Sequence, residues 1–105
     1  MRKERRNLTA GLPPVHPGAL LREDVLPSVN ISKSEIAKAL GISRAQLYAI
    51  LSERAPVTAS MALRLGRFFG NGPELWLNMQ SNYDLETLSR TMAREIDRIP
   101  SMKAA

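Results

Sequence analysis

The amino-acid sequence predicts an all-α fold of five helices, the last of them extended at its C-terminal end. Two observations predict this fold. Apolar residues recur at the spacing of amphipathic helices, and no segment alternates as a strand would. Serine or threonine caps precede apolar segments, and glycines follow them. The 105 residues, without cysteine, are enough to bury an apolar core that needs no disulfide.

The chain divides into three parts: a basic arm over residues 1–15, a domain over 16–83, and a C-terminal helical extension and tail over 84–105. The arm carries four cations within residues 2–6 and shows no amphipathic period, so we expect it to be flexible. It could contact DNA phosphates, enter a minor groove, contact a protein partner or serve as a solubilising tail.

The first helix is predicted over roughly residues 18–26, where apolar side chains stand at helical spacing. Pro27 follows and is expected to end it. His16 precedes a Pro-Gly pair just before this helix. We interpret His16 as a structural residue, because a metal site would need further ligands and the sequence has one histidine and no cysteine.

The second and third helices have clear start and stop signals. Ser32 and Glu35 form an S-x-x-E capping box at the start of the second helix, and Gly41 is expected to end it in the left-handed conformation. Ser43 and Gln46 form a similar box at the start of the third helix. Two short helices joined by a tight turn are therefore predicted.

The pattern across this pair of helices is that of a DNA-binding helix-turn-helix. That motif needs a small residue where the helices meet, a glycine in the turn and apolar residues at fixed places. All seven places are suitably filled, by Ile36, Ala37, Leu40, Gly41, Ile42, Leu47 and Ile50. The alternative, an ordinary helical hairpin without a ligand, explains fewer of these positions.

The third helix is predicted to present small side chains to a ligand. Its apolar residues point inward, which turns Ala45 and Ala49 outward. Small residues allow a close approach to base edges in the major groove, where Arg44 can pair with guanine and Gln46 with adenine. The side chain of Gln46 is equally suited to the capping box. Phosphate contacts are expected from Tyr48 of this helix and from Ser34 of the second helix.

The fourth helix is predicted to begin after Thr58 and to end at Gly70, and Pro73 opens the fifth. On the fifth helix, Trp76, Met79 and Tyr83 share one face that suits packing on the other helices. A second apolar stripe points nearly the opposite way if the helix is unbroken, and it consists of Leu85, Leu88, Met92, Ile96 and Ile99. We expect this C-terminal apolar stripe to form a homodimer interface. The alternative is a break near residues 82–84 that folds the extension back.

The charge of the chain favours an anionic partner. The net charge is +5 and the pI is near 10.2, as is common for proteins that bind nucleic acid. No apolar run approaches the ~20 residues of a membrane span, and no signal peptide is apparent, so a soluble cytoplasmic protein is expected. No catalytic constellation, phosphate-binding glycine loop or metal-ligand cluster is seen, so neither an enzyme nor a cofactor is expected.

Three segments of this sequence resemble the HigA-type antitoxins, which belong to the lambda-repressor-like (XRE) helix-turn-helix superfamily. They are "HPGALLREDVL", "SEIAKALGISRAQLYAILSERAPVTASMALRLGRFFG" and "PELWLNMQSNYDL", and the resemblance covers about residues 15–90. The resemblance implies a protein that neutralises a small RelE/HigB-type mRNA-cleaving toxin and that represses its own operon as a dimer. It assigns DNA contacts to Ser43, Arg44, Ala45 and Gln46, and a phosphate contact to Arg54.

One position departs from the family pattern, because many relatives carry glycine where this chain has Glu53. An anionic residue beside the DNA backbone is unfavourable. Two other functions are compatible with the same motifs: a stand-alone repressor without a toxin partner, and an interaction adaptor that does not bind DNA. The outward alanines argue against the adaptor, since it would gain nothing from a close fit to a groove.

Overall fold

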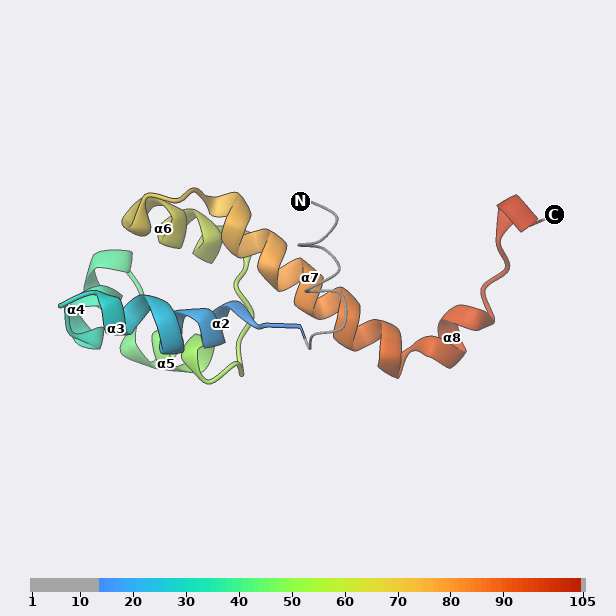
Figure 1. Cartoon of the computed structure of the whole chain (residues 1–105), viewed down its shortest axis with the longest axis horizontal. Helices are drawn as coiled ribbons and strands as arrows, with labels where there is room; N and C mark the ends of the chain where they lie inside the picture. The colour runs from blue at the N-terminus through green and yellow to red at the C-terminus, as the bar shows by residue number, and fades with distance from the viewer. Residues whose placement is uncertain (1–13, 105) are drawn as a thin grey trace, which may run out of the picture.

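The computed structural model describes residues 14–104, and the regular elements within that range are all helical (Figure 1). The predicted all-α fold is confirmed. Helices α2 to α6 and the first part of α7 form a body, from which the rest of the chain projects (Figure 1). The predictions for the basic arm concern residues that, apart from 14 and 15, lie outside the described part of the chain.

The first helical segment is continuous and comprises α2 (Pro17–Leu20), the π-helical turn η1 (Leu21–Val25) and α3 (Leu26–Ser28). The prediction that Pro27 ends this helix is wrong, because Pro27 lies within α3. The turn before it is wide: the N–H of Leu26 donates to the carbonyl of Leu21, five residues back. A proline ring clashes with the carbonyl four residues back in an α-helix, and the wider π spacing accommodates the ring.

The helix-turn-helix pair consists of α4 (Lys33–Leu40) and α5 (Arg44–Leu51). Both predicted N-caps are present, but the box predicted at Ser32 is incomplete, because the carboxylate of Glu35 accepts the hydroxyl of Ser32 at 3.0 Å and not its backbone N–H. The hydroxyl of Ser32 accepts the N–H of Glu35 at 3.1 Å, and Ser43 and Gln46 form a complete capping box. Gly41 has φ 74°, the left-handed conformation expected at the end of a helix. The turn therefore forms as the sequence predicts.

The remaining body helices are α6 (Ala59–Phe69) and α7 (Pro73–Thr91). Thr58 caps α6, Gly70 ends it, and Pro73 is the first residue of α7, all as predicted. From α6, Arg64 donates to the carbonyl of Leu40 at 2.7 Å. This bond satisfies one of the orphan carbonyls at the end of α4 and ties α6 to the turn of the pair.

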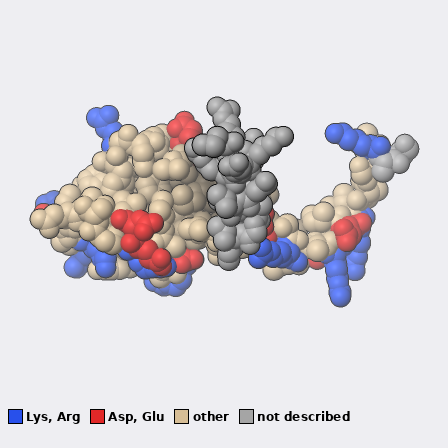
Figure 2. Space-filling view, in the orientation of Figure 1, with Lys and Arg blue, Asp and Glu red and all other residues tan. Residues whose placement is uncertain are grey.

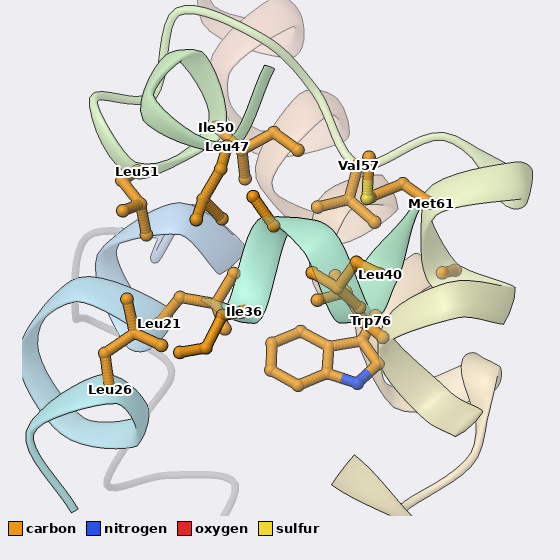
Figure 3. Packing of buried hydrophobic residues seen from close by; sticks show 13 residues of the cluster. Leu21, Leu26, Ile36, Leu40, Leu47, Ile50, Leu51, Val57, Met61 and Trp76 are labelled. Carbon is orange, nitrogen blue, oxygen red and sulfur yellow. The ribbon is translucent and has the colours of Figure 1, made fainter. Parts of the chain in front are cut away.

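The core lies where the body helices converge (Figure 3). Trp76 of α7 is completely buried, and its indole N–H donates to Oδ1 of Asn71 at 2.9 Å. Gln80, one turn further along α7, is buried as well: its Oε1 accepts the N–H of Val57 at 2.8 Å. The predicted inward face of α7 is confirmed, and Gln80 is a polar member of it that the apolar pattern could not reveal.

Helix α7 continues without a break through residues 82–84, so the alternative that folds the extension back at that point is wrong. The break comes later, at Met92, whose backbone (φ −103°, ψ 11°) separates α7 from α8 (Ala93–Asp97). A short 3-10 turn, η2 (Met102–Ala104), follows. The extension projects away from the body (Figure 1), and the Cα radius of gyration is 16.8 Å, against ~13 Å for a compact chain of this length.

Candidate nucleic-acid interface

Helix α5 presents the surface that the sequence assigned to base recognition. Leu47, Ile50 and Leu51 are buried in the core, each at most 4% exposed. Because these three point inward, Arg44 and Ala45 at the start of the helix are exposed. The remaining predicted residues lie as expected: Ser34, Ser43, Gln46, Tyr48 and Arg54 are exposed, and Ala49 is half-buried.

The side chain of Gln46 is engaged in the capping box. Its Oε1 accepts the N–H of Ser43 at 3.0 Å, and the hydroxyl of Ser43 accepts the N–H of Gln46 at 3.0 Å. A bidentate pair with adenine requires the amide oxygen as well as the amide nitrogen. Gln46 must therefore open the box to read adenine in that way, whereas its amide N–H groups can donate to a base while the box stays closed.

Helix α5 ends in a Schellman-type turn that has a glutamate at the left-handed position. The N–H of Glu53 donates to Ile50 at 3.0 Å and that of Arg54 to Ala49 at 2.9 Å. Glu53 has φ 64°, and no other non-glycine residue among those described has a positive φ. Glycine adopts this conformation without strain, which fits the glycine that the resemblance implies at this position.

Arg22, on η1, supports this turn from the side. Its Nη1 donates to the carbonyl of Leu51 at 2.6 Å and to Oε2 of Glu53 at 3.2 Å. Its Nη2 donates to Oε2 of Glu23 at 2.7 Å. These hydrogen bonds with Glu23 and Glu53 raise the pKa of the guanidinium. Arg22 therefore links the first helix to the end of α5, a role that residue spacing did not indicate.

An open groove with three basic side chains in its lining lies beside α5, with a volume of about 430 Å³; we call it the basic groove. It is lined by Arg22, Lys33, Tyr48, Leu51, Ser52 and Arg54. Lys33 extends from the first turn of α4 over the ring of Tyr48, with 5.8 Å from its Nζ to the ring centroid, and Nε of Arg54 donates to Ser52 at 2.9 Å. Figure 2 shows Lys and Arg side chains along the edge of the body where α4 and α5 lie, with acidic groups beside them. Cations and hydroxyls in this arrangement suit a phosphate backbone.

Two of the groove residues, Tyr48 and Arg54, were predicted to contact phosphate. Sequence reasoning missed Arg22 and Lys33. The signal for Lys33 was its place at the start of α4, next to Ser34, where a helix crossing the DNA backbone presents its first turn.

His16 has the structural role that the sequence predicts. It is 3% exposed, it caps α2 by accepting the N–H of Gly18 on Nδ1 at 2.9 Å, and its ring meets Tyr83 edge-on at 5.0 Å. Burial lowers the pKa of the imidazole, which favours the neutral form that can accept this bond. A Cβ on Gly18 would lie 1.8 Å from the carbonyl oxygen of Ile50, so glycine is what allows α2 to approach α5.

The C-terminal apolar stripe is exposed in the single chain, as the sequence implied for a monomer. Exposed fractions are 69% for Leu85, 51% for Leu88, 37% for Met92 and 50% for Ile96. No group of His, Cys, Asp and Glu that could hold a metal ion occurs among residues 14–104. Within the same range, none of the helices has the length and apolar character to cross a membrane.

The exposed helix α5, joined to α4 by a tight turn that ends at a serine cap and set beside a groove with basic side chains, defines a helix-turn-helix protein. Residues 21–77 match the helix-turn-helix family HTH_3, more than half of the chain. The chain belongs to this family.

Relatives within the family support the resemblance to HigA-type antitoxins. Virulence-associated protein I of Dichelobacter nodosus is 44% identical over 71% of this chain and 69% of its own length. The structure of the Pseudomonas aeruginosa antitoxin HigA with the higBA promoter is similar at 36% identity, with a TM-score of 0.78 over 85% of this chain and 98% of that one. Antitoxin GraA in complex with its operator is similar at 38% identity, with a TM-score of 0.80 over 88% and 94% of the two chains.

Proposed function

We propose that this protein is an antitoxin that binds operator DNA as a homodimer and represses its own operon. The observation that carries the proposal is the exposed start of α5 beside the basic groove. There Arg44, Ala45 and Gln46 can reach base edges while the groove holds a phosphate strand. The operator complexes of the similar HigA and GraA antitoxins support this assignment.

The residues of the interface divide into two groups by what they can do. Arg44 supplies a bidentate donor for guanine, and the methyl groups of Ala45 and Ala49 let the helix sit close to the bases. Ser34, Ser43, Tyr48 and Arg54, together with Lys33 of the groove, supply phosphate contacts that fix the position of α5.

The homodimer rests on the C-terminal apolar stripe. Five large apolar residues between 85 and 99 are exposed, although the helix breaks at Met92 in their midst, and exposed apolar surface of this kind marks an interface. A two-fold pair of protomers would place two α5 helices on two half-sites of an inverted repeat.

We infer a toxin partner from the family resemblance, and we propose that it is a small RelE/HigB-type toxin. Co-expression with the small protein encoded next to this gene should relieve the growth arrest that the small protein causes alone, and the two chains should co-purify. Growth arrest that persists, with no complex on affinity purification, would leave the stand-alone repressor as the function.

Hydroxyl-radical footprinting on the DNA upstream of the gene tests the DNA-binding proposal. Two protected half-sites are expected, with centres about 34–36 Å apart or a multiple of that distance. Ala45→Glu should remove the protection because it places a carboxylate against the bases. Ala39→Glu is the matched control, since Ala39 is exposed on α4 but does not line the groove. Uniform cleavage with the wild-type protein would contradict the proposal.

A further inference from the structure

Glu53 places a carboxylate at the edge of a groove that is otherwise basic. None of the side chains that line the groove is acidic. Glu53 reaches this edge through its bond to Arg22, at 3.2 Å from Oε2 to Nη1. A phosphate that enters the groove therefore meets the carboxylate beside the cation that would bind it.

The backbone of Glu53 carries strain that a glycine would not. At φ 64° a side chain is disfavoured, and residues in this region usually persist where the surroundings hold them. Here the surroundings are Arg22, which bonds both the carboxylate of Glu53 and the carbonyl of Leu51 at the end of α5. The glutamate is thus held in place by the arginine that it neutralises.

The donors of Arg22 are divided among three protein oxygens. Nη1 serves Leu51 and Glu53, and Nη2 serves Glu23. Both ion pairs are partly exposed, with 41% of the Arg22 side chain and 33% of the Glu53 side chain accessible to solvent. A phosphate oxygen can replace Glu53 only by competing with it.

We propose that Glu53 limits the affinity of this protein for DNA, by occupying Arg22 and repelling the phosphodiester that the groove would otherwise hold. The proposal rests on the DNA-binding function proposed above. In the wild-type complex, Arg22 stays paired with Glu53, and Lys33 and Arg54 make the phosphate contacts of the groove. Without the Glu53 carboxylate, Nη1 of Arg22 can donate to a phosphate in each protomer, while Nη2 keeps its bond to Glu23.

The test compares Glu53→Gln and Glu53→Gly with the wild type by fluorescence anisotropy, with a random-sequence duplex and a duplex from upstream of the gene as probes. One added phosphate contact per protomer steepens the log–log salt dependence by about 0.9, or about 1.8 for a dimer. The ratio of Kd at 200 mM salt to Kd at 50 mM salt should therefore rise about twelvefold in both variants. Glu86→Gln is the matched control, because Glu86 forms an exposed ion pair with Arg90 on α7.

A variant that also lacks Arg22 provides a second, independent measurement. In an Arg22→Gln background, Glu53→Gln should no longer steepen the salt dependence, because the added ligand is absent. An unchanged slope in Glu53→Gln, an equal change in Glu86→Gln, or a steepening that persists without Arg22 would each overturn the proposal. Thermal unfolding verifies that the variants fold. Glu53→Gly should have a higher Tm than Glu53→Gln, because glycine relieves the strain of the left-handed backbone.

The two proposals fail in different ways. If the wild-type protein binds both duplexes and the variants have the wild-type slope, only the role of Glu53 is lost. If neither the wild type nor any variant binds a duplex at 50 mM salt, the proposed function fails, and the role of Glu53 fails with it.

Discussion

At the scale of single residues, His16 joins three helices although it takes no part in the DNA-facing surface. Its ring caps α2 and contacts Tyr83 of α7, and Gly18, the residue it caps, lies directly against Ile50 of α5. A neutral imidazole makes this cap, and burial keeps it neutral by lowering its pKa below the ordinary 6.5, although Glu53 and Asp84 oppose the shift. The packing of α2 against α7 is therefore linked to one proton.

Stability should fall as the pH falls below 6.5. In that range the unfolded chain binds a proton at His16 that the folded chain excludes, so the free energy of unfolding decreases as the pH falls. His16→Asn keeps a capping acceptor and does not titrate. Urea unfolding between about pH 5 and 7.5 should show that this decrease is smaller in the variant. Parallel profiles for the two proteins would contradict the assignment.

Hydrogen bonds from distant side chains are what sequence reasoning could not predict at this scale. Arg22 reaches Leu51, Arg64 reaches Leu40, and Gln80 reaches Val57. In each bond the partners are more than 20 residues apart, so neither spacing nor periodicity relates them. The outward residues of α5 could be predicted because a helical period fixes which side is buried.

At the scale of elements, local signals predicted the boundaries of α4, α5 and α6. The N-caps were predictable because each capping bond joins residues three apart in the sequence, as for Ser32, Ser43 and Thr58. Gly41 adopts the left-handed conformation for which glycine is suited. The prediction failed at Pro27, since a π turn accommodates the ring. No residue type marks a π turn in the sequence.

The C-terminal apolar stripe is the element whose function is easiest to disrupt without unfolding the body. Leu88→Glu/Met92→Glu should convert a dimer to a monomer, because it places two carboxylates in the proposed interface. The body should stay folded, since both side chains are exposed in the single chain. Analytical ultracentrifugation gives the mass, and circular dichroism verifies the helix content.

Thr91→Glu serves as the control for this experiment, because Thr91 is exposed on the same helix but does not belong to the stripe. A double variant that is folded and has the wild-type mass would show that the stripe does not hold the protomers together.

At the scale of the whole molecule, the body and the projecting extension have separate proposed functions, DNA binding and dimerisation. Helix α5 lies at one edge of the body, and the end of α7 and α8 project away from the body (Figure 1). In the proposed dimer, this separation would allow two bodies to bind successive half-sites while the extensions pair. The net charge of +5 favours encounter with DNA, but it confers no sequence preference.

The central claim is that α5 contacts base edges. The base specificity of DNA binding by Arg44→Ala tests this claim most directly. Binding of this variant and of Arg67→Ala, an exposed arginine on α6, would be measured against operator duplexes that carry every base pair in turn at each half-site position. The account predicts that Arg44→Ala loses about 1–3 kcal/mol of binding free energy and discriminates less between base pairs at one position of the half-site. Arg67→Ala should keep the wild-type base preference. Unchanged affinity and preference in Arg44→Ala, and likewise in Gln46→Ala, would contradict the assignment of α5 as the recognition helix.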